Sequence, residues 1–157
     1  YDRLIKAHSK LINDGFIHNL VIIGNGAERK RLEQLIKNLN VEKSVILKGF
    51  VGNPYPYIKE CDIFVCSSRN EGYSLAVAEA VVLQKVVIAC KCSGPVEILD
   101  NGKYGYIVDN SENGLYAGIK EILTNCKLRA YYSKKVKERI DFFDINSVIK
   151  EVDKILL

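Results

Sequence analysis

Short apolar runs alternate with longer amphipathic stretches along this chain. Five runs have the continuous hydrophobicity of strands that are buried on both faces: Leu20–Ile23, Val45–Leu47, Ile63–Cys66, Val86–Ala89 and Tyr106–Val108. Strands of this kind, separated by helices, are typical of a parallel sheet. The pattern therefore predicts an α/β fold in which one parallel sheet carries helices on both faces.

The helices are predicted from apolar residues that recur with a period of about 3.6 residues. The chain opens in or just before an amphipathic helix that contains Leu4 and Leu11. Further helices are expected at 27–38, 57–60, 115–123, 128–140 and 145–156, together with one that begins near Ser74 and a short turn of helix around Pro95. No internal repeat interrupts the alternation, so residues 1–157 are expected to form a single domain.

The composition changes this picture little. Of the 157 residues, 48% are apolar and 27% are charged, which is ordinary for a globular domain with a substantial core. The net charge of +4 is too small to require a nucleic-acid partner. No apolar run reaches the roughly 18 residues of a membrane span, and no secretory signal opens the chain, so a cytoplasmic protein is expected.

The cysteines indicate the redox compartment of the protein, and the absence of methionine indicates whether the sequence is a whole protein. Five cysteines are an odd number, and three lie in or beside apolar runs, so buried free thiols in a reducing compartment are expected. His8 and His18 lie in no cluster with Cys or Asp, so no metal site is predicted. The chain contains no Met and begins at Tyr1, so we expect it to be a piece of a longer protein.

The segment Arg69–Ala80 combines a polar turn with the start of a helix. It follows the predicted strand Ile63–Cys66, and Ser74 is placed to cap the helix. The free N–H groups and the positive dipole end of a helix attract anions such as phosphate, and Gly72 lets a ligand approach the backbone. Glu79 lies five residues after Ser74, about 7 Å along the helix axis at roughly 1.5 Å per residue.

Two acids at this spacing suit the two ends of a nucleotide-sugar. With a diphosphate at the helix start, the side chain of Glu79 leans back toward an attached ribose, whose hydroxyls can donate to a carboxylate. Glu71, in the turn itself, faces whatever is attached to the other end of the diphosphate. The plain alternative is that Glu79 lies on the one solvated face of an apolar helix and that the unit binds nothing.

Four turns follow predicted strands and converge on one edge of the predicted sheet. They are Gly24–Gly26, Gly49-Phe50, Ser67–Gly72 and Cys92–Gly94. Ligands of parallel α/β sheets bind beyond the carboxyl ends of the strands, so this convergence favours the nucleotide interpretation. The first turn does not indicate NAD, because Arg29 stands where the dinucleotide fingerprint has its third Gly and no acid ends the following strand.

Three other features have two interpretations each. Phe50 is placed to stack on a base, or it belongs to the core. Arg69 is placed to meet a phosphate, or it pairs with a neighbouring acid. The basic stretch 127–139 is a solvated helix face, or, with Tyr131 and Tyr132 interleaved, it makes a peripheral contact with an anionic membrane surface.

Taken in order, these motifs resemble the C-terminal, donor-binding domain of the GT-B glycosyltransferases, specifically glycosyltransferase family four. The resemblance covers roughly Leu4 to Asn125. Its specificity comes from the order and spacing of its segments, which are Leu20-Val-Ile-Ile-Gly-Asn-Gly, Val45-Ile-Leu-Lys-Gly-Phe-Val, Cys61-Asp-Ile-Phe-Val-Cys-Ser-Ser, Glu71-Gly-Tyr-Ser-Leu with Glu79-Ala, Gly94-Pro-Val-Glu-Ile and Gly105-Tyr-Ile-Val. The Glu71–Glu79 pair fits the family's Glu-x7-Glu motif.

The resemblance implies a Rossmann-like fold and a retaining transferase that moves a sugar from a nucleotide-diphosphate donor without a metal ion or other cofactor. It implies that Glu79 binds the ribose hydroxyls and that Glu71, the candidate catalytic residue, contacts the donor sugar. The other candidate donor-binding residues are Gly72, Tyr73, Ser74 and Leu75 for the diphosphate or sugar, Phe50 and Val51 for the base, Gly24 and Gly26 at the border of the site, and Arg69.

The chain also departs from the family pattern. The Arg and Lys that usually neutralise the diphosphate lie upstream of the first helix, and this chain begins after them. The N-terminal, acceptor-binding domain is missing as well, and Tyr73 replaces a frequent Phe. We therefore expect a parent enzyme of polysaccharide, lipid or other glycoconjugate synthesis and an inactive fragment. Two alternatives are a non-catalytic interaction module on the same scaffold and a nucleotide-sugar epimerase.

Overall fold

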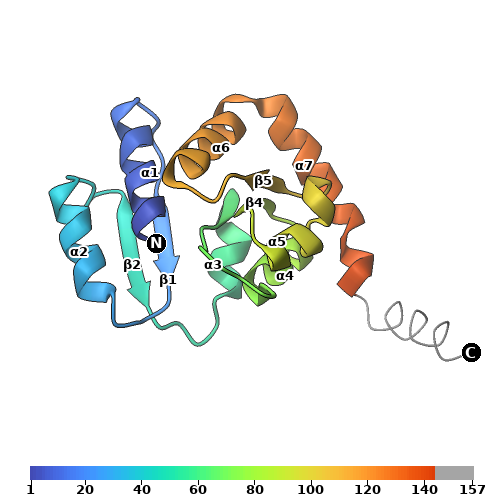
Figure 1. Cartoon of the computed structure of the whole chain (residues 1–157), viewed down its shortest axis with the longest axis horizontal. Helices are drawn as coiled ribbons and strands as arrows, with labels where there is room; N and C mark the ends of the chain where they lie inside the picture. The colour runs from blue at the N-terminus through green and yellow to red at the C-terminus, as the bar shows by residue number, and fades with distance from the viewer. Residues whose placement is uncertain (144–157) are drawn as a thin grey trace, which may run out of the picture.

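The computed structural model describes residues 1–143 and alternates helices with short strands (Figure 1). The strands are β1 (Leu20–Ile23), β2 (Val45–Gly49), β3 (Ile63–Cys66), β4 (Val86–Cys90) and β5 (Tyr106–Val108). The α-helices are α1 (Asp2–Asn13), α2 (Arg29–Asn38), α3 (Tyr55–Glu60), α4 (Leu75–Val82), α5 (Ser93–Ile98), α6 (Glu112–Thr124) and α7 (Cys126–Glu138). Within residues 1–143 there are also two 3₁₀ helices, η1 (Asp100–Gly102) and η2 (Ile140–Phe143).

Every pairing between these strands is parallel, as predicted, but the strands form two sheets rather than one. β1 pairs with β2, and the second sheet has the order β3-β4-β5. Within residues 1–143, β1 and β3 each have a strand partner on one side only. Continuous hydrophobicity predicts where a strand runs, whereas its neighbour depends on how the connecting helices pack.

The central strand β4 is the most completely enclosed element, since all five of its residues are buried. Val86, Ile88 and Cys90 pack with residues of α1 and α6, whereas Val87 and Ala89 pack with residues of α4, α5 and α7. This alternation follows the two-residue period of a strand. The prediction of helices on both faces is therefore confirmed for the second sheet.

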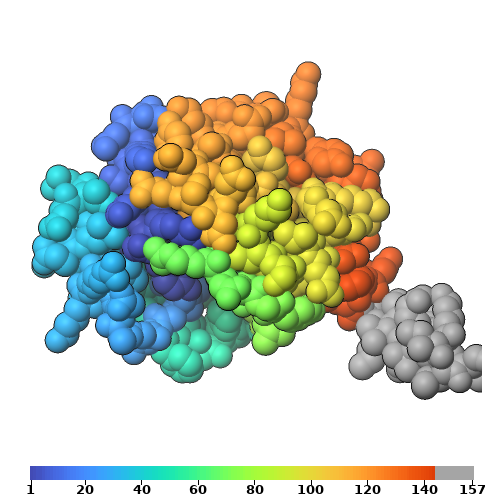
Figure 2. Space-filling model, viewed as in Figure 1, coloured from blue at the N-terminus to red at the C-terminus, as the bar shows by residue number. Residues whose placement is uncertain are grey.

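The first sheet has a smaller core. Ile22 of β1 packs with Ile5 of α1 and Ile36 of α2, whereas Val21 and Ile46 are 43% and 44% exposed. α1 also packs along α6, and in the space-filling view its blue residues are in contact with the orange residues of α6 (Figure 2). One helix thus joins the first sheet to the core of the second.

The other predicted helices are present, with shifts of a few residues at their ends. α3 begins at Tyr55 rather than Tyr57, because Asn53 Oδ1 accepts the Tyr55 N–H at 3.1 Å and Pro54 occupies the N-cap position. α7 begins ahead of the predicted start because Asn125 caps it. The helix predicted at 145–156 lies outside the described residues. No helix within the described part of the chain is long and apolar enough to cross a membrane.

Candidate functional site

The start of α4 presents backbone N–H groups just beyond the end of β3. Ser74 is the N-cap, as predicted, and has extended backbone angles of φ −104° and ψ 93°. The first helical hydrogen bond is donated by the Ala78 N–H to the Ser74 carbonyl at 3.0 Å. The N–H groups of residues 75–77 therefore lack a partner within the helix, which is the arrangement that favours an anion.

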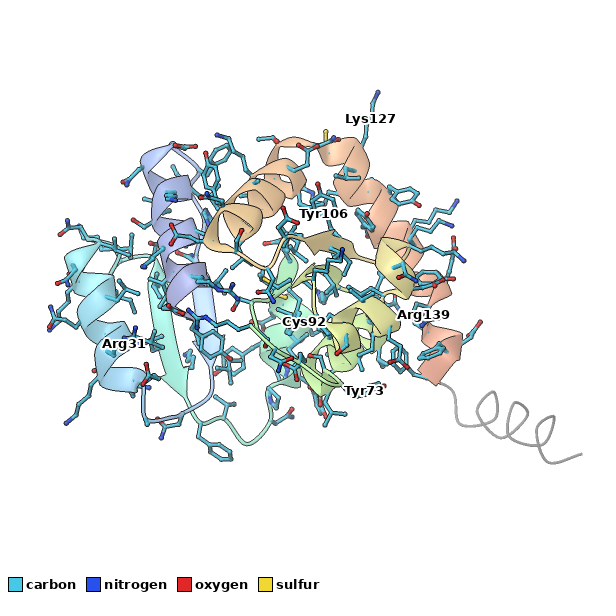
Figure 3. The ribbon with its side chains drawn as sticks, in the orientation of Figure 1. Arg31, Tyr73, Cys92, Tyr106, Lys127 and Arg139 are labelled. Carbon is cyan, nitrogen blue, oxygen red and sulfur yellow. The ribbon has the colours of Figure 1, made fainter. Side chains whose placement is uncertain are left out.

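The hydroxyl of Ser74 has a different role from the one that N-capping suggests. Ser74 is only 3% exposed, and its Oγ lies 4.0 Å from Cys66 Sγ and forms no capping hydrogen bond. Its side chain is part of the packing under the turn, so only its backbone is available to a ligand. Tyr73 and Leu75 on either side are 50% and 70% exposed, and Figure 3 shows Tyr73 at the edge of the molecule.

The turn that contains Glu71 and Gly72 is held in place by the start of α5. The Glu71 carbonyl accepts hydrogen bonds from the Gly94 N–H at 3.1 Å and from Ser93 Oγ at 2.9 Å. A Cβ at Gly94 would lie 2.7 Å from Tyr73 Cα and 2.8 Å from the Gly72 carbonyl oxygen. The predicted turn at 92–94 therefore supports the Glu71 turn directly, and its Gly94 N–H is already used.

Glu79 is the only charged residue of the otherwise apolar helix α4 and is partly buried. Its Oε1 accepts a hydrogen bond from the hydroxyl of Tyr55 at 3.3 Å. Within the described part of the chain, neither Glu71 nor Glu79 forms an ion pair. Both carboxylates can therefore accept hydrogen bonds from the hydroxyl groups of a ligand.

Arg69 pairs with a neighbouring acid, which is one of the two roles considered for it. Its Nη2 donates to Asp2 Oδ2 at 2.8 Å. This hydrogen bond is the main reason why the pKa of Asp2 falls to about 2. The side chain of Arg69 is nevertheless 64% exposed, so the pair lies at the surface beside the turn rather than under it.

A group of polar residues beneath the same turns was not foreseen. Arg3 of α1 donates to the Ser67 carbonyl at 3.1 Å and to the carbonyl and Oδ1 of Asn110, each at 2.7 Å. Asn110 Nδ2 donates to the Arg69 carbonyl at 2.8 Å and to Cys92 Sγ at 3.2 Å. Figure 3 shows Cys92 near the middle of the molecule. Asn110 follows β5, so its place after a predicted strand was the one signal that could have revealed it.

The candidates from the first sheet lie at its carboxyl edge. Gly24 has a φ of 130°, which favours glycine, and its N–H donates to the Gly49 carbonyl at 2.8 Å. Gly26 is exposed, with no atom within 4 Å of the position that a Cβ would take. Phe50 is 82% exposed, so it does not belong to the core of the described chain, and Val51 is partly buried. The ring of Phe50 is available for stacking.

The cysteines follow the sequence expectation in part. Cys66, Cys90 and Cys92 are buried, Cys61 is partly buried, and Cys126 is exposed; all five are free thiols. Burial raises the pKa of Cys90 to about 11, so this group stays protonated at neutral pH.

The basic helix α7 does not expose both of the tyrosines that were considered for membrane contact. Tyr131 is 47% exposed, but Tyr132 is only 8% exposed and packs in the main core with Tyr106. Figure 3 shows Lys127 pointing away from the body of the molecule. Only one of the two interleaved tyrosines is therefore available to an interface, which favours the solvated-face interpretation. Membrane contact stays a prediction.

The comparisons with known proteins bear on the family and the fold of this chain. The model of the family "Glycosyl transferases group 1" matches residues 1–139. The N-acetylgalactosamine-N,N'-diacetylbacillosaminyl-diphospho-undecaprenol 4-alpha-N-acetylgalactosaminyltransferase of Campylobacter jejuni is 35% identical to this chain over 156 residues, which are 98% of this chain and 42% of that protein.

Two solved structures have the same fold. A mutant of S. aureus TarM in complex with UDP has a TM-score of 0.85 at 24% identity, over 98% of this chain and 32% of that chain. Anabaena HepE in complex with UDP has a TM-score of 0.83 at 21% identity, over 98% of this chain and 44% of that chain. This chain spans less than half of each of these proteins. With a family match that covers nearly all of the described residues, the chain belongs to the glycosyl transferases group 1 family, and its fold is that of the matching part of the GT-B glycosyltransferases.

Proposed function

We propose that this chain is the donor-binding domain of a glycosyltransferase that uses a nucleotide-diphosphate sugar and retains the configuration of the transferred sugar. The observation that carries the proposal is the start of α4, where backbone N–H groups without helical partners lie between Glu71 and Glu79. In this proposal residues 72–75 hold the diphosphate or sugar through the backbone, Glu79 accepts the ribose hydroxyls, and Glu71 contacts the donor sugar.

The proposed reaction needs stabilisation of the charge that develops on the departing diphosphate. Preorganised N–H dipoles at a helix N-terminus supply it without reorganisation during the reaction. We therefore propose catalysis without a metal ion. Gly24 and Gly26 border the donor site in this proposal, Phe50 and Val51 meet the base, and Arg69 lies at its rim.

The acceptor side belongs to the rest of the parent protein. We propose that an upstream domain binds a polysaccharide, lipid-linked or other glycoconjugate acceptor and closes over the donor. The Campylobacter relative is named for a diphospho-undecaprenol-linked acceptor, and TarM and HepE were solved with UDP, which makes UDP the first nucleotide to test here. A cytoplasmic enzyme with a peripheral contact through the basic face of α7 would fit such an acceptor.

The test is ligand-observed NMR on the 157-residue chain with UDP, GDP and ADP. We expect one nucleotide to bind saturably and Glu79→Ala to weaken it tenfold or more, because hydrogen bonds to a charged group contribute about 1.5–3 kcal/mol. Glu42→Ala removes an exposed glutamate far along the chain from α4 and serves as the matched control, with no expected effect on binding.

Other outcomes would redirect the proposal. Binding that is unchanged in a folded Glu79→Ala variant would overturn the role of Glu79. The absence of saturable binding to any of the three nucleotides, in this chain and in a longer chain that includes the upstream Arg and Lys, would count against a donor site and favour a non-catalytic interaction module. Conversion of a nucleotide-sugar without any acceptor would favour an epimerase.

A further inference from the structure

The Tyr55–Glu79 hydrogen bond joins the segment after β2 to the helix that follows β3. The Tyr55 hydroxyl donates to Glu79 Oε1 at 3.3 Å, across 24 positions in the sequence. We propose that Tyr55 is a positioning residue, which orients the carboxylate of Glu79 toward the ribose hydroxyls of the donor nucleotide. This inference rests on the proposed function, and it adds a residue that neither the Glu71–Glu79 motif nor the sequence indicates.

The phenol of Tyr55 is well placed for this role because its backbone is fixed from both sides. Asn53 Oδ1 accepts the Tyr55 N–H at 3.1 Å, and Pro54 and Pro56 flank it in the sequence. One turn later, Ile58 is 7% exposed and packs in the same core cluster as residues of α4. α3 and α4 therefore share one core cluster, and the Tyr55 hydroxyl lies within hydrogen-bond distance of Glu79 Oε1.

Glu79 needs such a partner because nothing else in α4 can direct its side chain. The other residues of this helix are Leu, Ala and Val, so no neighbour on the helix offers a hydrogen-bond donor from its side chain. An ionised carboxylate has about four acceptor positions, and a single phenol occupies one of them. A lysine or arginine at position 55 would instead neutralise the charge and compete with a ribose. Tyrosine orients the carboxylate and leaves its charge and its other acceptor positions available.

The inference predicts a loss of ribose recognition rather than of phosphate recognition. Removing the hydrogen bond from the Tyr55 hydroxyl with Tyr55→Phe should weaken UDP binding about three- to tenfold, because the carboxylate of Glu79 keeps its charge but loses its orientation. The effect should be smaller for 2′-deoxy-UDP, because that ligand lacks one of the hydroxyls that an oriented Glu79 would accept. It should vanish in a Glu79→Ala background, because Tyr55 then has no carboxylate to position.

The experiment is a double-mutant cycle of Tyr55→Phe and Glu79→Ala, with UDP and 2′-deoxy-UDP as ligands in NMR titrations of the 157-residue chain. Tyr57→Phe is the matched control, since Tyr57 lies on the same helix with its ring 5.4 Å from Lys48 Nζ. Urea unfolding of each variant measures whether the fold has changed. We expect Tyr57→Phe to bind like the wild type and Tyr55→Phe to lose affinity mainly for UDP.

The outcomes separate this inference from the proposed function. If Glu79→Ala loses UDP binding while Tyr55→Phe binds normally, the donor site stands and the positioning role is overturned. Effects of the two substitutions that simply add would also overturn it, because Tyr55 would then act independently of Glu79. If the wild type binds none of UDP, GDP and ADP, in this chain and in the longer chain, the proposed function fails and this inference fails with it. If Glu79→Ala binds as well as the wild type, the proposed role of Glu79 fails and this inference fails with it.

Discussion

At the scale of single residues, Gly94 allows the Glu71 turn to pack closely against the start of α5, because there is no room for a methyl group at this position. A Cβ would be 2.7 Å from Tyr73 Cα, which is backbone and cannot rotate away, so Gly94→Ala must displace the turn. We expect this substitution to cost about 1–3 kcal/mol in the free energy of unfolding and to weaken nucleotide binding. Gly52→Ala is the control, because a Cβ there meets no atom within 4 Å. Urea unfolding and UDP titration measure both effects, and equal stability of the two variants would contradict the prediction.

At the scale of elements, the first turn of α1 ties the loops after β3 and β5 together. Arg3 donates three hydrogen bonds of 2.7–3.1 Å to Ser67 and Asn110, and the groups that it leaves behind in Arg3→Ala are partly buried. We expect a loss of about 2 kcal/mol in the free energy of unfolding. Arg69→Ala breaks only an exposed ion pair with Asp2 and should cost less than about 1 kcal/mol. Chemical denaturation of both variants tests this order, and a larger loss in Arg69→Ala would contradict it.

At the scale of the whole molecule, a buried histidine joins the first sheet to α1. His8 is 2% exposed; its Nδ1 lies 2.9 Å from His18 Nε2, and its Nε2 lies 2.8 Å from Ser44 Oγ. Burial, with a smaller contribution from His18, lowers the pKa of His8 from 6.5 to about 4. Between these values the unfolded chain binds a proton that the folded chain does not. The free energy of unfolding should therefore fall as the pH drops from 6.5 toward 4, by at most about 1.4 kcal/mol per pH unit.

The measurement for this prediction is urea unfolding at pH 7.5 and pH 5 for the wild type and for His8→Gln. The substitution lowers stability at both pH values, so the slopes are compared rather than the stabilities. We expect a flatter pH dependence in His8→Gln. Asp2 does not interfere, because its contribution to stability changes only between its ordinary pKa of 3.8 and its folded pKa of about 2, below the pH range of the measurement. Equal slopes in the two proteins would show that His8 does not titrate as the structure indicates.

Much of the secondary structure could be predicted from the sequence, whereas the contacts that hold the candidate site in place could not. The five strands were evident because continuous apolar runs are a local signal. The spacing of Glu71 and Glu79 was equally local. The burial of the Ser74 hydroxyl, the contact of Gly94 with the Glu71 turn and the hydrogen bond from Tyr55 to Glu79 were not evident, because each depends on two segments that only packing brings together.

By itself, the sequence determined the alternation of strands and helices, the turns at the carboxyl ends of the strands and the acidic pair around the start of α4. These features depend on residue identity and on spacings of a few positions, which set local backbone preference and the direction of nearby side chains. Only the tertiary structure decided that the strands form two parallel sheets and that Arg3 bonds to Asn110, 107 positions away. The physical reason is that the packing of the helices determines which strand edges and loops come into contact. Hydrophobic periodicity describes each segment separately and does not specify these contacts.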